Sequence, residues 1–290
     1  MQDDKYHTWL IETDALARLL ETDPAADRVV LDCSWYLPGT GKHALDDFAE
    51  AHVPGARFVD LADISDPESP YVNMMPAAAR FAAAMGALGI GPETDVIVYD
   101  SGYVSARLWW MFRTFGHDRV RILNGGWRKW RAEGRPTESG DPQPATPRPF
   151  DAEKDAARIV ALSEMRKIVD TASATVIDAR TAARFRGQEG SGYPGVASGF
   201  MPGAINTPWQ LFFEPAPSHR FVSVDTARKI FASHGVDLAR PVVTTCGSGV
   251  TASILGFMIE LLGHSDWRLY DGSWHEWGQH PDTPKLTTPE

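Results

Sequence analysis

The chain has 290 residues, 43% of them hydrophobic and 23% charged, a composition typical of a globular protein with one large domain or two smaller ones. Its net charge of −10 argues against nucleic acid or an anionic membrane as a partner, because both attract clustered lysine and arginine. The sequence has no basic start followed by an apolar run and no apolar span of about 18 residues, so we expect a cytoplasmic protein. Cys33 and Cys246 are too few for a disulfide framework and fit a reducing compartment.

Strand and helix signals alternate along both halves of the chain. The predicted strands are 29–32, 96–99 and 120–123, then 175–178, 242–245 and 267–270. The predicted helices are 77–88 and 104–115, then 163–171, 226–234 and 251–262, with Ser163 expected to be the N-cap of its helix. Alternation of this kind indicates right-handed crossovers and an α/β fold with mainly parallel sheets flanked by helices.

A proline-rich stretch separates the two halves. Residues 134–150 contain five prolines and show no apolar period, which is typical of a stiff linker. We therefore predict a domain at 1–135, a linker at 136–157 and a second domain at 158–290.

The second half repeats the first. Asp32 and Asp178 end predicted strands 146 residues apart, and Asp100 and Cys246 have the same spacing. H-V-P-G-A at 52–56 matches F-M-P-G-A at 200–204, and N-G-G-W at 124–127 matches D-G-S-W at 271–274. Landmarks that recur in one order indicate two copies of one unit. Because a carboxylate cannot do thiol chemistry, we expect the first copy to be inactive and to form the other wall of a cleft.

Cys246 lies between a predicted strand and a predicted helix and is followed by Gly247, Ser248 and Gly249. Backbone N–H groups at a helix start have no helical acceptor, so such a loop is an anion cradle. The same donors and the helix dipole favour thiolate over thiol, and we interpret Cys246 as a covalent catalyst.

Two other interpretations of this loop stay open from the residues alone. Residues 247–252 also match the G-x-G-x-x-A dinucleotide fingerprint, although few residues follow for the rest of such a fold. Cys246 also fits a buried structural thiol, the interpretation that we give to Cys33.

Several motifs resemble those of the tandem rhodanese-like sulfurtransferases, in particular the 3-mercaptopyruvate sulfurtransferases. They are L-D-C-S-W-Y-L-P-G-T-G at 31–41, H-V-P-G-A-R-F-V-D-L at 52–61, S-P-Y-V-N-M-M-P at 69–76, L-N-G-G-W-R-K-W at 123–130, I-D-A-R-T-A-A-R-F-R-G at 177–187, C-G-S-G-V-T at 246–251 and Y-D-G-S-W-H-E-W-G at 270–278. Together they span nearly the whole chain, and the resemblance implies two rhodanese-like domains, the second catalytic.

The resemblance also implies a reaction. Cys246 would take sulfane sulfur from 3-mercaptopyruvate as a persulfide, release pyruvate, and pass the sulfur to thioredoxin, a small thiol or cyanide, without a cofactor. Ser248 and His52 would form the proton relay, and Arg184 would bind the donor carboxylate. The backbone of the loop would hold the persulfide anion, through Gly247, Gly249, Val250 and Thr251. Nine histidines show no metal-ligand spacing, so we predict no metal site.

The chain departs from the family pattern in one segment. Tyr193 stands where the family commonly has a second substrate arginine, and residues 187–199, rich in glycine and serine without a basic residue, are predicted to be a flexible loop. The sulfur donor therefore differs from 3-mercaptopyruvate, or another cation such as Arg186 replaces the missing arginine.

His52 also has a second interpretation, as a side chain that only hydrogen-bonds a turn.

Proteins with three other functions usually carry different residues in the loop that begins at Cys246. Thiosulfate sulfurtransferases share the architecture but usually carry basic residues after the cysteine, where Gly247 and Ser248 are neutral. A rhodanese-fold phosphatase would need arginine at Ala252 to clamp phosphate. A non-catalytic rhodanese-like binding module often lacks the cysteine.

Overall fold

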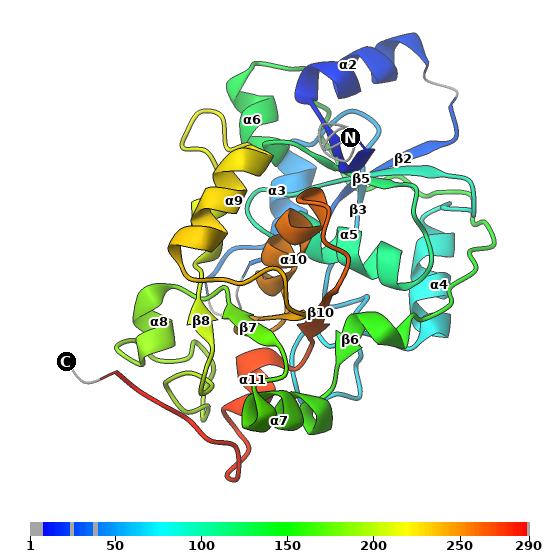
Figure 1. The fold of residues 1–290 in the computed structure, drawn as a ribbon. Helices are drawn as coiled ribbons and strands as arrows, with labels where there is room; N and C mark the ends of the chain where they lie inside the picture. Colours follow the sequence, from blue (N-terminus) through cyan, green and yellow to red (C-terminus); the bar gives the residue numbers. More distant parts are fainter. Residues whose placement is uncertain (1–7, 24–25, 37–39, 289–290) are drawn as a thin grey trace.

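The computed structural model describes residues 8–23, 26–36 and 40–288 (Figure 1). Within them, each half of the chain forms a five-stranded sheet whose paired strands are all parallel. The first sheet has the order β1-β5-β4-β2-β3, with β1 (Leu10–Ile11), β2 (Arg28–Asp32), β3 (Arg57–Phe58), β4 (Asp95–Tyr99) and β5 (Val120–Leu123). The second has the order β6-β10-β9-β7-β8, with β6 (Ile159–Val160), β7 (Thr175–Asp178), β8 (Ile205–Asn206), β9 (Val242–Thr245) and β10 (Trp267–Tyr270). The two orders are the same once each strand is replaced by its repeat.

Helices flank both sheets, which confirms the predicted α/β class. In the first copy they are α2 (Thr13–Thr22), α3 (Ala44–Glu50), α4 (Ala78–Ala87), α5 (Ser105–Thr114) and α6 (Gly126–Ala132). In the second copy they are α7 (Leu162–Thr171), α8 (Ala182–Arg186), α9 (Val224–Ser233), α10 (Ala252–Leu261) and α11 (Ser273–Trp277), with the short 3₁₀ helices η1 (Ala156–Arg158) and η2 (Trp209–Phe212).

The predicted central strands agree with the structure to within one residue, because runs of β-branched residues mark strands buried on both faces. The predicted cap at Ser163 is wrong. Helix α7 begins at Leu162, and its N-cap, Ala161, has no side-chain hydrogen bond. Residues 37–39 of the L-D-C-S-W-Y-L-P-G-T-G motif lie outside the described residues.

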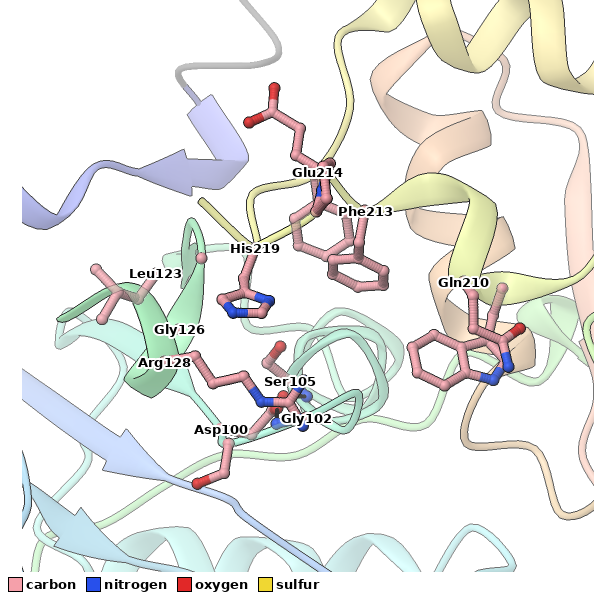
Figure 2. Close-up of a pocket in the computed structure, with 15 residues that line it drawn as sticks. Asp100, Gly102, Ser105, Leu123, Gly126, Arg128, Gln210, Phe213, Glu214 and His219 are labelled. Carbon is pink, nitrogen blue, oxygen red and sulfur yellow. Dashed lines mark hydrogen bonds between the residues drawn. The ribbon is translucent and has the colours of Figure 1, made fainter. Parts of the chain in front are cut away.

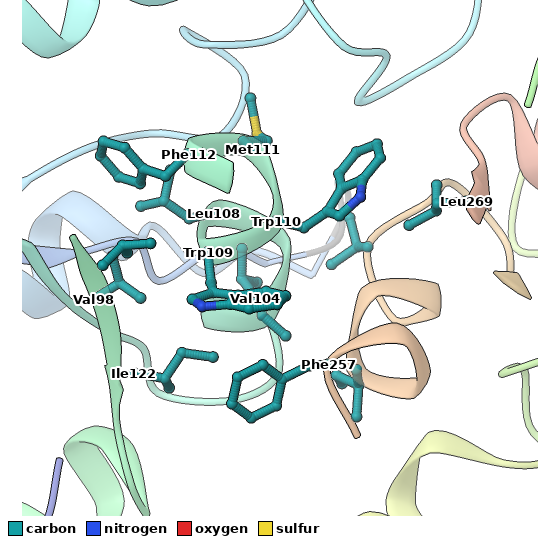
Figure 3. Close-up of a cluster of buried hydrophobic side chains, with 14 of the residues drawn as sticks. Val98, Val104, Leu108, Trp109, Trp110, Met111, Phe112, Ile122, Phe257 and Leu269 are labelled. Atoms are coloured by element: carbon teal, nitrogen blue, oxygen red, sulfur yellow. The ribbon is translucent and has the colours of Figure 1, made fainter. Parts of the chain in front are cut away.

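Helices α5 and α10 join the two copies through a shared hydrophobic core (Figure 3). Trp109 of α5 meets Phe257 of α10 edge to face, with ring centroids 4.8 Å apart. Both tryptophans of the Trp109-Trp110 pair are fully buried. Because α5 follows Asp100 and α10 follows Cys246, this contact brings the two loops to the boundary between the copies.

The predicted linker, residues 136–157, lies between the two sheets in the sequence and is anchored on the first copy. The N–H of Arg148 donates to the carbonyl of Gly86, and its guanidinium pairs with Asp27. The ring of Phe150 packs against Phe81, 5.9 Å between centroids. The path of this stretch is therefore set by its contacts with the first copy as well as by its prolines.

We predict that Phe257→Ala destabilises the protein by about 3–5 kcal/mol, because it leaves a cavity opposite Trp109 in a fully buried interface. Urea unfolding followed by tryptophan fluorescence measures the change. Leu45→Ala, at a side chain that is 47% exposed, is the control. A loss for Phe257→Ala no larger than for the control would contradict the role of this interface.

Candidate active site

Cys246 follows β9 directly and lines a cavity of about 290 Å³ at the boundary between the copies. Its side chain is only 2% exposed, but it forms part of the cavity wall, so a small molecule in the cavity would meet it. Trp35 and Tyr103 of the first copy line the same cavity. Residues of both copies therefore line one cavity, as expected if the first copy forms the other wall of the cleft.

The loop after Cys246 leaves several backbone donors without an acceptor. Its carbonyls are engaged, since those of Cys246 and Gly247 accept hydrogen bonds from Trp274 (2.9 Å) and His275 (2.8 Å) at the start of α11. The N–H of Cys246 donates to Ser273 Oγ at 3.2 Å. By contrast, none of the N–H groups of residues 247–251 donates to an acceptor in the described part of the chain. These five donors meet the physical requirement for an anion cradle.

The first copy contains the same cradle, but it is already filled. The carboxylate of Asp100 accepts hydrogen bonds from the backbone N–H groups of Gly102, Val104 and Ser105, the Val104 bond at 2.9 Å. A cavity of about 400 Å³ borders this loop, and Figure 2 shows Arg128 and His219 reaching toward it.

The sequence repeat aligns these donors with the unpaired ones of the second copy. Given the offset of 146 residues between Asp100 and Cys246, the three donors around Asp100 correspond to Ser248, Val250 and Thr251. The fold thus builds one anion cradle twice. One is closed by its own side chain and the other is open at a thiol.

Arg107 of α5 supports the open loop from the first copy. It is fully buried, and its Nη1 lies 2.8 Å from Asp271 Oδ1, as an ion pair without the alignment of a hydrogen bond. Its Nη2 donates to the carbonyl of Asn73 at 2.5 Å. Gly249, at φ 78°, lies so close that a Cβ there would be 3.0 Å from Nη1. Glycine at this position allows both the left-handed backbone and the close approach.

Ser248 is held in the cavity by the same assembly. Its hydroxyl oxygen accepts a hydrogen bond from the side-chain amide of Asn73 at 3.2 Å, and it lines the cavity two residues after Cys246. Gly247, Val250 and Thr251 line the cavity as well.

Arg184 also reaches the cavity, from α8. Its guanidinium packs against Gly192, and its Nε lies 3.9 Å from Glu189. The other arginine of the cavity wall, Arg180, is bound to Asp178 with a closest distance of 2.7 Å, so its charge is balanced. Arg186 is exposed and is not part of this cavity wall. Of these arginines, Arg184 is the one placed to meet a carboxylate.

The structure does not bring His52 to Cys246. Its ring stacks on Phe48 at 3.9 Å, and its Nδ1 forms a 2.7 Å hydrogen bond with the Phe48 carbonyl. It lines a different cavity, with Glu138, on the first copy. The geometry matches the other interpretation of His52, a side chain that braces the turn after α3, and corrects the expectation that it projects across the cleft.

Sequence reasoning missed several parts of the site. Arg107 and Asn73 support the loop from the first copy, and the signal for Arg107 was a basic residue next to the apolar run at 108–112 of its helix. Residues 187–199, predicted to be flexible, pack on the cavity, with the N–H of Tyr193 donating to Ser191 Oγ at 3.1 Å. Cys33 is buried with its thiol 3.3 Å from the Tyr99 carbonyl, as expected of an inert core thiol.

Comparison with known proteins identifies the family. The sequence profile of the rhodanese-like domain matches residues 12–133 and again residues 161–280. The chain belongs to the rhodanese-like family. It is 41% identical to human 3-mercaptopyruvate sulfurtransferase, over 86% of this chain and 84% of the human protein. It is 37% identical to chicken thiosulfate sulfurtransferase, over 93% and 91% of the two chains.

Solved structures agree with this assignment. SseA, a 3-mercaptopyruvate sulfotransferase of Escherichia coli, superposes with a TM-score of 0.83 at 31% identity, over 92% of this chain and 99% of that one. The Tum1 protein of Saccharomyces cerevisiae gives a TM-score of 0.85 at 27% identity, over 96% and 98%. The rhodanese-like chain described here is therefore a sulfurtransferase with tandem domains. Across its described residues, no group of three or more His, Cys, Asp or Glu side chains is arranged to hold a metal, and no helix is long and apolar enough to cross a membrane.

We predict that Arg107→Met destabilises the protein by about 3–5 kcal/mol, because it leaves the buried carboxylate of Asp271 without its counter-charge. The matched change Arg119→Met, in an exposed pair with Glu93, should cost less than about 1 kcal/mol. Chemical unfolding measures both changes. Equal effects of the two substitutions would show that Arg107 does not hold the loop.

Proposed function

We propose that this protein moves sulfane sulfur from 3-mercaptopyruvate to an acceptor through a persulfide on Cys246, with release of pyruvate. The acceptor would be a thiol, such as thioredoxin or a small thiol, or cyanide, in the cytoplasm. The sulfurtransferase relatives support the reaction class.

One observation carries the persulfide step. A cysteine persulfide places its terminal sulfur two bonds beyond Cβ, as aspartate places its carboxylate oxygens. Asp100 in the first copy therefore resembles the persulfide anion that we propose for Cys246, with three backbone N–H groups already directed at the charge. At Cys246 the corresponding donors are free, so a persulfide anion would gain the hydrogen bonds that Asp100 makes.

The same contrast supports an inactive first copy. The Asp100 carboxylate has no sulfur to transfer, and it occupies the donors that an incoming anion would need. We propose that the first copy instead supplies Arg107 and Asn73 beneath the catalytic loop.

The choice of donor rests on the charges of the cavity. 3-Mercaptopyruvate carries one carboxylate, which Arg184 would pair with at the cavity wall. Thiosulfate is a dianion, and Gly247 and Ser248 add no positive charge beside Cys246. Thiosulfate transfer is the second candidate, because relatives of both names match the chain to similar extents.

We predict that Cys246→Ser abolishes pyruvate release from 3-mercaptopyruvate and thiocyanate formation from thiosulfate and cyanide. The wild-type protein should gain the mass of one sulfur atom after treatment with the donor, and the variant should not. Cys33 corresponds to Ala179 in the second copy, so Cys33→Ala should retain both activities. Turnover by Cys246→Ser would contradict the covalent mechanism, and a faster wild-type rate with thiosulfate would favour the second candidate.

We predict that Arg184→Gln raises KM for 3-mercaptopyruvate about 10- to 100-fold, because a charged hydrogen bond to the carboxylate is worth about 1.5–3 kcal/mol. Steady-state pyruvate release measures it. Arg186→Gln, at the exposed arginine of the same helix, is the control and should leave KM unchanged. An unchanged KM in Arg184→Gln would remove this arginine from the binding site.

A further inference from the structure

Tyr193 lies directly over the catalytic loop. Its ring contacts Gly247, the residue after Cys246, where an added Cβ would be 3.3 Å from Cε2 and 3.4 Å from the phenol oxygen. It lines the same cavity as Cys246 and Ser248. The hydroxyl therefore lies beside the residue that follows Cys246, on the wall of the same cavity.

Tyr193 is held through both its ring and its backbone. The ring packs on that of His275, 4.5 Å between centroids, and the N–H of His275 donates to the Gly247 carbonyl. Ser191 Oγ accepts from the backbone N–H of Tyr193 at 3.1 Å and donates to its carbonyl at 3.0 Å. A residue supported in this way keeps its orientation toward the loop.

The proposed reaction needs a proton donor at this place. When sulfur leaves 3-mercaptopyruvate, the electron pair of the broken C–S bond remains on an enolate, which must be protonated to give pyruvate. His52 lies in a different cavity and does not reach the site. Burial raises the pKa of Tyr193 to about 12 against the opposing effect of a hydrogen bond from Ser248, so its hydroxyl keeps a proton at neutral pH. An enolate is basic enough to remove it.

We propose that Tyr193 is the general acid of this sulfurtransferase and protonates the departing enolate beside Ser248. The inference rests on the function proposed above. It assigns to Tyr193 a catalytic role, although this residue stands where the resemblance predicted a substrate-binding arginine.

The step balances without a further reactant. The Cys246 thiolate attacks the thiol sulfur of 3-mercaptopyruvate, the S–S bond forms, and the C–S bond breaks. The enolate takes the proton of Tyr193 and becomes the methyl group of pyruvate. The tyrosinate then takes the proton that the transferred sulfur brought with it, leaving a persulfide anion in the loop. The donor's own proton thus ends in pyruvate, and Tyr193 returns to its starting form.

The test uses two donors that differ in their need for a proton. From thiosulfate, Cys246 takes sulfur with release of sulfite, which leaves with the electron pair and needs no proton. In Tyr193→Phe, which keeps the ring on Gly247 and His275, kcat for pyruvate release should fall about 100-fold with little change in KM. Formation of the Cys246 persulfide from thiosulfate, followed by mass spectrometry in a single turnover, should change by less than about threefold in the same comparison, because general-acid catalysis does not contribute to that step.

Tyr71→Phe is the matched control. Tyr71 also contacts His275, 5.9 Å between ring centroids, and forms a hydrogen bond with His280, but it is not part of the wall of the Cys246 cavity. It should retain both reactions.

Each other result would overturn the inference. A rise in KM alone would make Tyr193 a binding residue, and an equal loss with both donors would make it a structural one. Loss of pyruvate release in Tyr103→Phe but not in Tyr193→Phe would assign the proton to the phenol on the opposite wall. If the wild-type protein releases no pyruvate at all, the proposed function fails first, whereas normal pyruvate release by Tyr193→Phe refutes only the role of Tyr193.

Discussion

Five backbone N–H groups after Cys246 have no acceptor in the described chain, and the rest of the site is arranged around them. Backbone donors without a protein acceptor give up the hydrogen bonds that stabilise an ordinary loop, so the surrounding structure must hold this loop in place. Here the carbonyls of the loop are bound to the first turn of α11, and Arg107 packs beneath Gly249. The donors are thereby left open, as the persulfide anion proposed for Cys246 would require.

The two copies solve this problem in different ways. In the first, the carboxylate of Asp100 accepts hydrogen bonds from the loop, so its donors are satisfied. In the second, Cys246 leaves the donors free. The copies thus differ in the residue that follows the fourth strand of each unit, β4 or β9. The shared core between α5 and α10 places the filled loop and the open one at the same boundary.

Much of this could be predicted from the sequence, because the signals were local. The strands rich in β-branched residues and the glycines after Cys246 are short segments that can be recognised one at a time, and the repeat matches such segments between the two halves. Those predictions agree with the structure. The prediction for His52 depended instead on the path of a side chain between two domains. Its ring instead stacks on Phe48, four residues earlier, so a local contact holds it within the first copy. Arg107 was missed for a different reason, because its partner Asp271 lies 164 positions away in the chain. The sequence marked Tyr193 as a departure from the family pattern but could not show its contact with Gly247, 54 positions away.

Tyr193 stands where the resemblance predicted a substrate-binding arginine, and the two side chains would act differently on the cavity wall. An arginine is always charged and would attract the donor carboxylate, but it has no proton to give. A buried phenol is neutral, so it attracts the carboxylate less and can release a proton to a strong base. If Arg184 binds the carboxylate and Tyr193 donates the proton, as proposed, the cavity would divide these two tasks between two side chains of one segment. Donor selection would then depend both on the charge that Arg184 offers and on whether the leaving group must be protonated.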